Sequence, residues 1–313
     1  MGSRERAIPR LRLGTRGSKL ALAQAHAVQS LLAPFGDVEI VTIKTSGDKG
    51  DRDRLGAFVR EIQESLLREE VDIALHCLKD LPTQEVPGLR LSAHLVREDA
   101  RDTLITRGPV LMDLPEGAVV GTGSVRRTSQ LAAVRPDLVF RPLVGNVDTR
   151  LGKLVSGEYD AIVLALAGLR RLGILESWSE FAYAGLSVHT LSEEEMLPAP
   201  GQAVLVLETR ESDAASHEVV KRFNHEDTEI CARAERAFLK AFGGGCSVPV
   251  AASGVVEREG LELRGLVASP DGRVVLRGVQ AGSKGDWRWL AARLVEELAA
   301  RGAMDVFKRG AEL

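Results

Sequence analysis

Two stretches of the sequence share one plan, which consists of a short apolar strand, a turn with Gly-Thr and a nearby serine, and an amphipathic helix. The strands are expected at 11–13 and 118–120, and the helices at 19–32 and 125–134. Ser18 is the expected N-cap of the first helix. Because a strand followed by a helix that packs back on it is the unit of α/β folds, the repeat predicts two α/β lobes of similar design.

A second pair of similar segments supports the same prediction. The near-continuous apolar runs at 71–75 and 159–164 are typical of strands that are covered on both faces. Strands and helices alternate through residues 11–175, which favours mixed or parallel sheets with right-handed crossovers. We expect residues 91–97 to carry the chain into the second lobe and the apolar, strand-like segment 197–207 to return it. Two such crossings predict a hinge and a cleft.

The last third of the sequence has a different pattern, which predicts a small α+β domain. Its expected elements, in order, are a helix at 227–242, strands at 250–256, 261–268 and 274–281, and a helix at 287–301. The expected domains are therefore 1–95 with 199–214 (first α/β lobe), 100–192 (second α/β lobe) and 218–313 (third domain).

Composition excludes several functional classes. The chain has 313 residues, of which 44% are hydrophobic, and a formal net charge of -3, so no global positive field recruits nucleic acid or an anionic membrane. No apolar run reaches the roughly 18 to 20 residues of a membrane-spanning helix, and the N-terminus lacks the apolar core of a signal peptide. With three widely spaced cysteines, the sequence predicts a cytoplasmic protein without disulfides or a metal site.

One cysteine follows three successive glycines, at 243–245. Glycine can adopt backbone angles that other residues cannot, so the turn displays the thiol of Cys246 instead of burying it. The alternative is a structural turn that happens to contain a small residue. Cys77 and Cys231 are expected to fill the core.

Arginines gather at the expected strand-to-helix turns, where free backbone N–H groups and the helix dipole already favour an anion. These residues are Arg16, Arg126, Arg127, Arg150, Arg170 and Arg171. If the strand ends share one edge of each sheet, the arginines converge and predict a polyanionic ligand. The alternative is a solvated surface on which the arginines form salt bridges.

A polar segment follows the first apolar run and places Asp80 beside Lys79. A carboxylate at this strand end could stabilise a developing cation or exchange a proton with a leaving amine. The alternative for Asp80 is a helix N-cap. For His76 a hydrogen-bonded core position is favoured over the role of a base.

Taken together, these motifs resemble the porphobilinogen deaminase family, also called hydroxymethylbilane synthase. The matching segments, in the family's order, are 15–18, 76–82, 121–127, 145–150, 157–162, 167–173, 197–202 and the loop around Cys246.

The resemblance implies a monomeric transferase of three domains whose first two domains are similar to the lobes of periplasmic binding proteins. In this family the cysteine that corresponds to Cys246 carries a dipyrromethane cofactor through a thioether. Four porphobilinogen units are added to it in turn with loss of ammonia, and the linear hydroxymethylbilane is released by hydrolysis for tetrapyrrole (haem) biosynthesis.

The resemblance also implies roles for individual residues, with Asp80 as the catalytic group and no metal. The implied cofactor-binding residues are Cys246, Lys79, Ser18, Thr122, Ser124, Arg126, Arg127, Asn146 and Arg150. The implied substrate-binding residues are Arg16, Arg171, Gln24, Phe58 and Gln202. The sequence departs from the family at 50–57, which is shorter than the mobile loop usual in the family, and at Val144, where the family usually has an arginine.

Two other functions are consistent with parts of the sequence. A two-lobed solute receptor would explain the lobes and the arginines, but not Cys246 or Asp80. A cysteine-dependent redox or acyl-transfer enzyme would need a base near Cys246, and no His or Cys nearby in the sequence supplies one.

Overall fold

The computed structural model describes residues 10–46, 56, 59–176, 178, 183, 185–243 and 248–306, and it falls into two compact units. The first unit comprises the chain up to Val96 together with Leu205–Glu226, and the second comprises Arg97–Val204 and the chain from Asp227 onward. Within the described residues, none of the helices combines the length and the apolar character needed to cross a bilayer.

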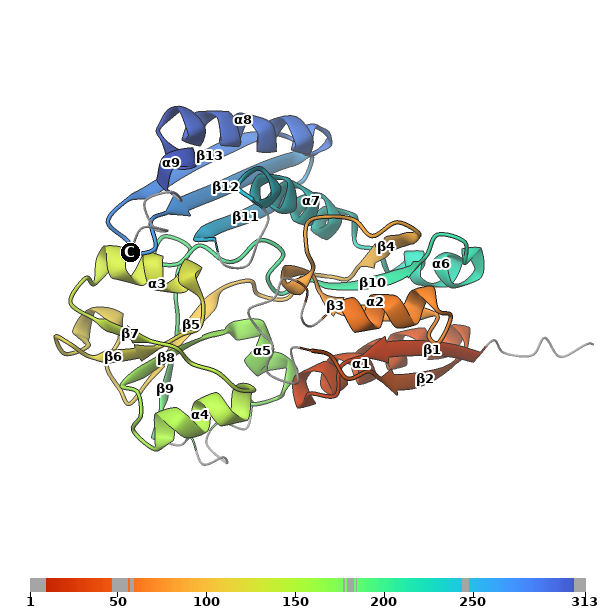
Figure 1. Cartoon of the computed structure of the whole chain (residues 1–313), viewed down its shortest axis with the longest axis horizontal. Helices are drawn as coiled ribbons and strands as arrows, with labels where there is room; N and C mark the ends of the chain where they lie inside the picture. The colour runs from red at the N-terminus through yellow and green to blue at the C-terminus, as the bar shows by residue number, and fades with distance from the viewer. Residues whose placement is uncertain are drawn as a thin grey trace, which may run out of the picture. The chain divides into compact units, whose positions relative to one another are not determined.

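The first unit is built on a five-stranded mixed sheet with the strand order β2-β1-β3-β10-β4 (Figure 1). Its strands are β1 (Arg10–Thr15), β2 (Asp37–Thr42), β3 (Ile73–Cys77), β4 (Leu89–His94) and β10 (Leu205–Arg210). Strand β1 runs parallel to β2 and β3, whereas β10 is antiparallel to β3 and β4. The chain therefore leaves this unit after β4 and returns to it with β10.

Helices cover both faces of this sheet. Helix α1 (Lys19–Leu32) packs with Ile73, and helix α2 (Arg60–Leu67) packs with Ala74, the next residue of the same strand. Because successive residues of a strand point to opposite faces, Ile73 and Ala74 of β3 are both apolar and both buried. Helix α6 (Ala214–Val220) also belongs to this unit.

The second unit contains a sheet of the same design, with the order β7-β6-β8-β5-β9. Its strands are β5 (Asp102–Thr106), β6 (Val119–Gly121), β7 (Val139–Arg141), β8 (Ala161–Ala165) and β9 (Ser187–Thr190). Strand β6 is parallel to β7 and β8, and β5 is antiparallel to β8 and β9. The two sheets thus match strand for strand, which confirms the predicted α/β lobes built on one plan; the hinge and cleft stay predictions.

Helices follow the strands of this second sheet. They are α3 (Val125–Val134), α4 (Val147–Val155) and α5 (Leu166–Arg171). Short 3₁₀ helices of the chain are η1 (Ala33–Phe35), η3 (Leu78–Asp80), η4 (Leu111–Asp113), η5 (Lys221–Phe223) and η6 (Lys284–Asp286).

The expected strand at 197–207 is wrong over most of its length. Extended strand structure begins only at Leu205, and the segment before it is a run of turns. Gly201 and Ala203 have φ angles of 71° and 69°, which lie outside the range of a strand, and Pro198 and Pro200 lack the N–H that a ladder needs. Its apolar residues are buried in turns, so their hydrophobic character does not indicate a strand.

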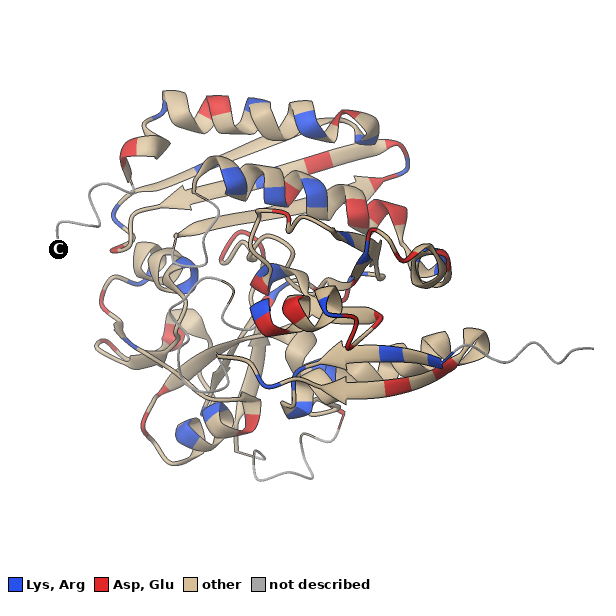
Figure 2. Ribbon diagram, turned by 45° about the vertical axis from the view of Figure 1, so that its right-hand side comes forward, with Lys and Arg blue, Asp and Glu red and all other residues tan. Residues whose placement is uncertain are grey.

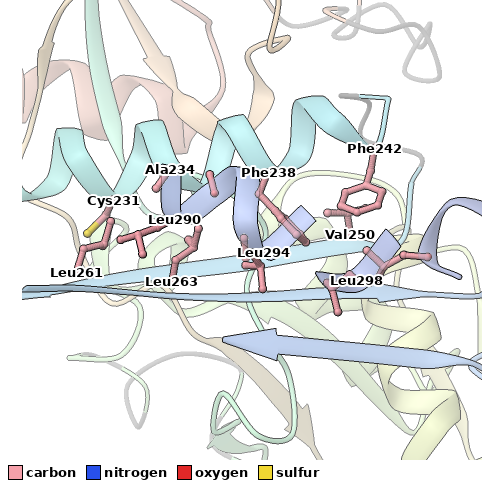
Figure 3. Close-up of a cluster of buried hydrophobic side chains, with 14 of the residues drawn as sticks. Cys231, Ala234, Phe238, Phe242, Val250, Leu261, Leu263, Leu290, Leu294 and Leu298 are labelled. Carbon is pink, nitrogen blue, oxygen red and sulfur yellow. The ribbon is translucent and has the colours of Figure 1, made fainter. Parts of the chain in front are cut away.

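A third sheet, in the order β11-β12-β13, lies in the C-terminal part of the second unit. Its elements are α7 (Glu226–Ala241), β11 (Val250–Glu257), β12 (Gly260–Ala268), β13 (Val275–Ser283), α8 (Trp287–Ala300) and α9 (Ala303–Val306). Phe238 of α7 and Leu294 of α8 meet Leu263 of β12 in one hydrophobic cluster (Figure 3). The predicted small α+β part is therefore confirmed, while the three domain boundaries remain predictions.

Charged residues of both signs are interspersed along the helices of this part (Figure 2). On α7 Arg233 pairs with Glu229, and on α8 Arg293 pairs with Glu296. Pairs at helical spacing that are partly or fully exposed to solvent, like these, stabilise a protein little and carry little functional information.

Candidate active site

The carboxyl edge of the first sheet holds a pocket of about 120 Å³. Strands β1 and β3 are parallel, so the residues that follow them lie at the same edge. The polar residues of the pocket lining are Thr15, Arg16, Ser18, Gln24, His76, Cys77, Lys79 and Asp80. The structure thus brings together five residues that the resemblance assigns to the site, namely Arg16, Ser18, Gln24, Lys79 and Asp80.

Ser18 fixes the local geometry of this pocket. Its hydroxyl accepts a hydrogen bond from the backbone N–H of Ala21 at 3.3 Å and so caps α1 as predicted. The cap begins the helix directly after the turn that carries Arg16.

Asp80 ends the short helix η3 and lines the pocket with Lys79. Among the described residues its carboxylate has neither a hydrogen-bond partner nor an ion-pair partner. The alternative role as an N-cap is not observed, because η3 precedes Leu81 and has no side-chain cap. The carboxylate is therefore available to a ligand.

The corresponding turn of the second unit lies between β6 and α3. The hydroxyl of Thr122 accepts a hydrogen bond from the backbone N–H of Ser124 at 3.2 Å, and Ser124 occupies the N-cap position of α3. Arg126 and Arg127 follow in the first helical turn.

Both arginines are buried and share one carboxylate, that of Asp102 at the start of β5. Each donates an Nη2–H to it at 2.8 Å, and Gln202 donates through Nε2 at 2.9 Å. The alternative of a solvated arginine surface is therefore wrong for Arg126 and Arg127. Asp102 was missed from the sequence because it ends a run of charged residues, 97–102, that looks solvated.

The charges of this cluster do not balance. Among the described residues two guanidinium groups pair with one carboxylate, and Gln202 is neutral, so the cluster has one positive charge more than Asp102 neutralises. Burial lowers the pKa of Arg126, with Arg127 acting in the same direction and Asp102 against it. The Nε of Arg127 is buried and has no hydrogen-bond partner within the described chain. The cluster therefore suits a further anionic group.

Asn146 and Arg150 lie together at the N-terminus of α4. The side chain of Asn146 accepts from the backbone N–H of Thr149 at 2.9 Å and caps the helix. The Nε of Arg150 donates to the carbonyl of Gly145 at 2.8 Å. Gly145 has a φ of 121°, and a Cβ there would lie 2.7 Å from Thr149, so the turn requires glycine.

Arg171 is the last residue of α5. It donates through Nη2 to the backbone carbonyl of Ala203 at 2.5 Å. The contact ties α5 to the turns at 197–204 that replace the expected strand.

Cys246 and Phe58 lie outside the described residues. Gly243, which precedes this loop, has a φ of 95° just after α7, so glycine ends the helix as predicted. Cys231 is a core residue, and its burial raises the pKa of its thiol to about 12. Cys77 is half-buried: it packs against the hydrophobic core cluster of the first unit, as expected, and it also lines the pocket.

Within the described residues, no three His, Cys, Asp or Glu side chains are grouped as metal ligands. Two α/β lobes of one strand order, each with arginines and a helix N-terminus after a central strand, define the class as a two-lobed α/β protein. A protein-family model described as "Porphobilinogen deaminase, dipyromethane cofactor binding domain" matches residues 11–218. Another, "Porphobilinogen deaminase, C-terminal domain", matches residues 229–300. The chain belongs to the porphobilinogen deaminase family, as the motifs predicted.

Curated relatives agree with this assignment over nearly the whole chain. The chain is 46% identical to "Porphobilinogen deaminase" of Thermus thermophilus over 300 residues, which covers 94% of this chain and 97% of the relative. It is 44% identical to "Porphobilinogen deaminase" of Geobacter sulfurreducens over 309 residues, which covers 96% of this chain and 94% of the relative.

The solved structures that the chain matches are distant from it in sequence. The periplasmic VFT2 domain of Bordetella pertussis BvgS has a TM-score of 0.43 and 17% identity, with 69% of this chain and 86% of that domain covered. An ancestral arginine-binding protein bound to glutamine has a TM-score of 0.38 and 15% identity, with 70% and 92% covered.

Proposed function

We propose that this chain is a porphobilinogen deaminase, a transferase that joins four porphobilinogen units with loss of ammonia and releases hydroxymethylbilane by hydrolysis, as a step of tetrapyrrole biosynthesis. The observation that carries the proposal is the pocket of the first unit, where Asp80 has no partner among the described residues and lies with Arg16 and Lys79. The family assignment over residues 11–218 and 229–300 supports it.

The residues present fit the dipyrromethane cofactor of the family, whose pyrrole rings carry carboxylate side chains. The cluster of Arg126 and Arg127 has one positive charge more than Asp102 neutralises, and a buried Nε–H of Arg127 has no partner among the described residues. These groups would hold carboxylates, with Thr122 and Ser124 beside them and Asn146 with Arg150 at the next helix N-terminus. Cys246 would hold the cofactor through a thioether, and the cofactor supplies the ring carbon to which the first substrate unit is joined.

The pocket of the first unit would receive the substrate. Arg16 would bind its carboxylates, with Gln24 as a further polar contact, whereas Lys79 and Ser18 of the same pocket would contact the cofactor. When the amine leaves, positive charge develops on the substrate, and the Asp80 carboxylate would stabilise it. Phe58 and Arg171 complete the proposed substrate contacts, whereas Gln202 would act through Asp102, to which it donates.

The same proposal includes the organisation and surroundings of the protein. It is a cytoplasmic monomer of three domains, at 1–95 with 199–214, 100–192 and 218–313, that binds neither nucleic acid nor membranes. The net charge of -3 supports the last point, because such partners are bound by positive fields.

The experiment is to incubate the purified protein with porphobilinogen and to measure its consumption together with the ammonia released. One ammonia per porphobilinogen is expected. Asp80→Asn keeps the shape of the side chain and removes its charge, so we expect turnover to fall by roughly a hundredfold or more. Asp37→Asn, at an exposed acid of β2, is the matched control and should behave as wild type.

A two-lobed receptor without enzymatic activity would bind porphobilinogen and release no ammonia. Near-normal turnover of Asp80→Asn would contradict the role of this carboxylate, and absence of ammonia release from wild type would contradict the function itself.

A further inference from the structure

A buried carboxylate and a histidine lie behind the pocket of the first unit, and the function proposed above assigns neither. His76 is on β3 and Glu208 is on β10, and both side chains are almost completely buried. The imidazole Nε2 lies 3.1 Å from a carboxylate oxygen of Glu208. His76 also lines the pocket that contains Lys79 and Asp80.

The sheet register fixes this pair. Val206 is opposite His76 and Glu208 is opposite Ala74, so His76 and Glu208 are diagonal neighbours on one face. Helix α2 covers that face, and the side-chain amide of Gln63 donates to both oxygens of Glu208 at 3.0 and 3.1 Å. The carboxylate is thus held from two sides.

This arrangement determines which nitrogen of His76 carries the hydrogen. A carboxylate only accepts hydrogen bonds, so Nε2 must be the donor to Glu208. Nδ1 then has the lone pair of the neutral ring, and no described residue forms a hydrogen bond with it. A carboxylate that accepts the hydrogen bond of one ring nitrogen fixes the tautomer and the orientation of the imidazole, so the other nitrogen is presented as the acceptor.

The proposed reaction needs such an acceptor. The aminomethyl group of the substrate arrives as an ammonium, and its C–N bond breaks with the electron pair remaining on nitrogen. A new C–C bond forms at a pyrrole carbon, and the C–H bond of that carbon breaks with its electron pair returning to the ring. The proton lost from carbon and the departing ammonia together make one ammonium ion, so no oxidant or reductant is required.

We propose that His76 accepts this proton through Nδ1 in the pocket beside Asp80, and that Glu208 is the positioning residue that holds its ring. The inference rests on the proposed function, because it names the base of the same reaction. Asp80 then stabilises the developing cation, and His76 accepts the proton, so two groups of one pocket have separate roles.

Two variants separate this role from a structural one. His76→Gln can still donate to Glu208 from nearly the position of Nε2, but it cannot carry a proton. We expect kcat per cofactor-loaded molecule to fall by roughly a hundredfold or more, with KM, loaded fraction and unfolding midpoint close to wild type. Glu208→Gln leaves the ring in place without its charge, and kcat should fall by roughly ten- to a hundredfold.

The measurements are the intact mass of each protein, which gives the loaded fraction, its unfolding midpoint, and its rate of ammonia release. A His76→Gln variant with kcat within about twofold of wild type overturns the proposal. A variant that loses stability or cofactor in proportion to its rate indicates a structural role and also overturns it. If wild type neither carries the added mass nor releases ammonia, the proposed function itself has failed, and the two failures are therefore distinct.

Discussion

The cluster around Asp102 leads to a sharp prediction about stability. In Asp102→Asn the amide has nearly the shape of the carboxylate, but one acceptor oxygen is replaced by an NH₂ group. Arg126 and Arg127, which both donate to Asp102 at 2.8 Å, then share a single acceptor oxygen at position 102. Two buried positive charges also lose the carboxylate with which they pair among the described residues.

The magnitude follows from burial. Asp102 is 0% exposed and the two arginines are 4% and 7% exposed, so water cannot replace the lost acceptor. Removing one partner of a buried ion pair costs about 3 to 5 kcal/mol. This corresponds to roughly two to four powers of ten in the unfolding equilibrium. Without Asp102, burial and Arg127 both act to lower the pKa of Arg126 without opposition.

Urea denaturation followed by circular dichroism measures this effect, and intact mass measures the fraction of molecules that carry the cofactor. Both the free energy of unfolding of the second unit and the loaded fraction are expected to fall. Glu296→Gln, at an exposed ion pair of α8, is the control and should leave the midpoint unchanged. An Asp102→Asn protein as stable and as fully loaded as wild type would refute the reasoning.

The remaining predictions concern Asp72 and Cys231. Burial acts to raise the pKa of Asp72, but hydrogen bonds from Arg12 outweigh it and leave the pKa below its ordinary value. A carboxyl group whose pKa is lower in the folded than in the unfolded state stabilises the folded protein. The contribution of Asp72 is fully present above its unfolded-state pKa of about 3.9, and it is lost as pH falls through its folded-state pKa. The stability difference between wild type and Asp72→Asn in urea should therefore shrink below about pH 4, and a constant difference would contradict this. Because burial raises the pKa of Cys231 to about 12, iodoacetamide should label this thiol only after unfolding, as peptide mass spectrometry can check.

Local signals in the sequence were sufficient for much of the fold. The predicted helices at 19–32 and 125–134 match α1 and α3 residue for residue, because apolar periodicity and a serine at the N-cap position agree in both. The sequence did not predict that β10 in the first sheet and β5 in the second sheet are antiparallel strands at corresponding positions. Their position in each sheet depends on pairings between residues far apart in sequence, which no local pattern encodes.

The site was predicted in part. Asp80 and Lys79 were predicted because they directly follow an apolar strand, and residues at that position lie at the carboxyl edge of the sheet, where the pocket is. Their buried partners were missed, although a signal existed for Glu208, since an acid inside an apolar strand needs a partner. Asp102 gave no such signal from its neighbours in sequence, because its partners come from α3 and from Gln202.

The central claim is that Cys246 carries the dipyrromethane cofactor to which the substrate units are added. The intact mass of the purified protein tests it most directly, with Cys246→Ser as the comparison. Wild type should exceed the mass of its sequence by two linked pyrroles, located on the peptide that contains Cys246, and the variant should match its sequence. A wild-type mass equal to that of the sequence, or an added group on another residue, would contradict the account.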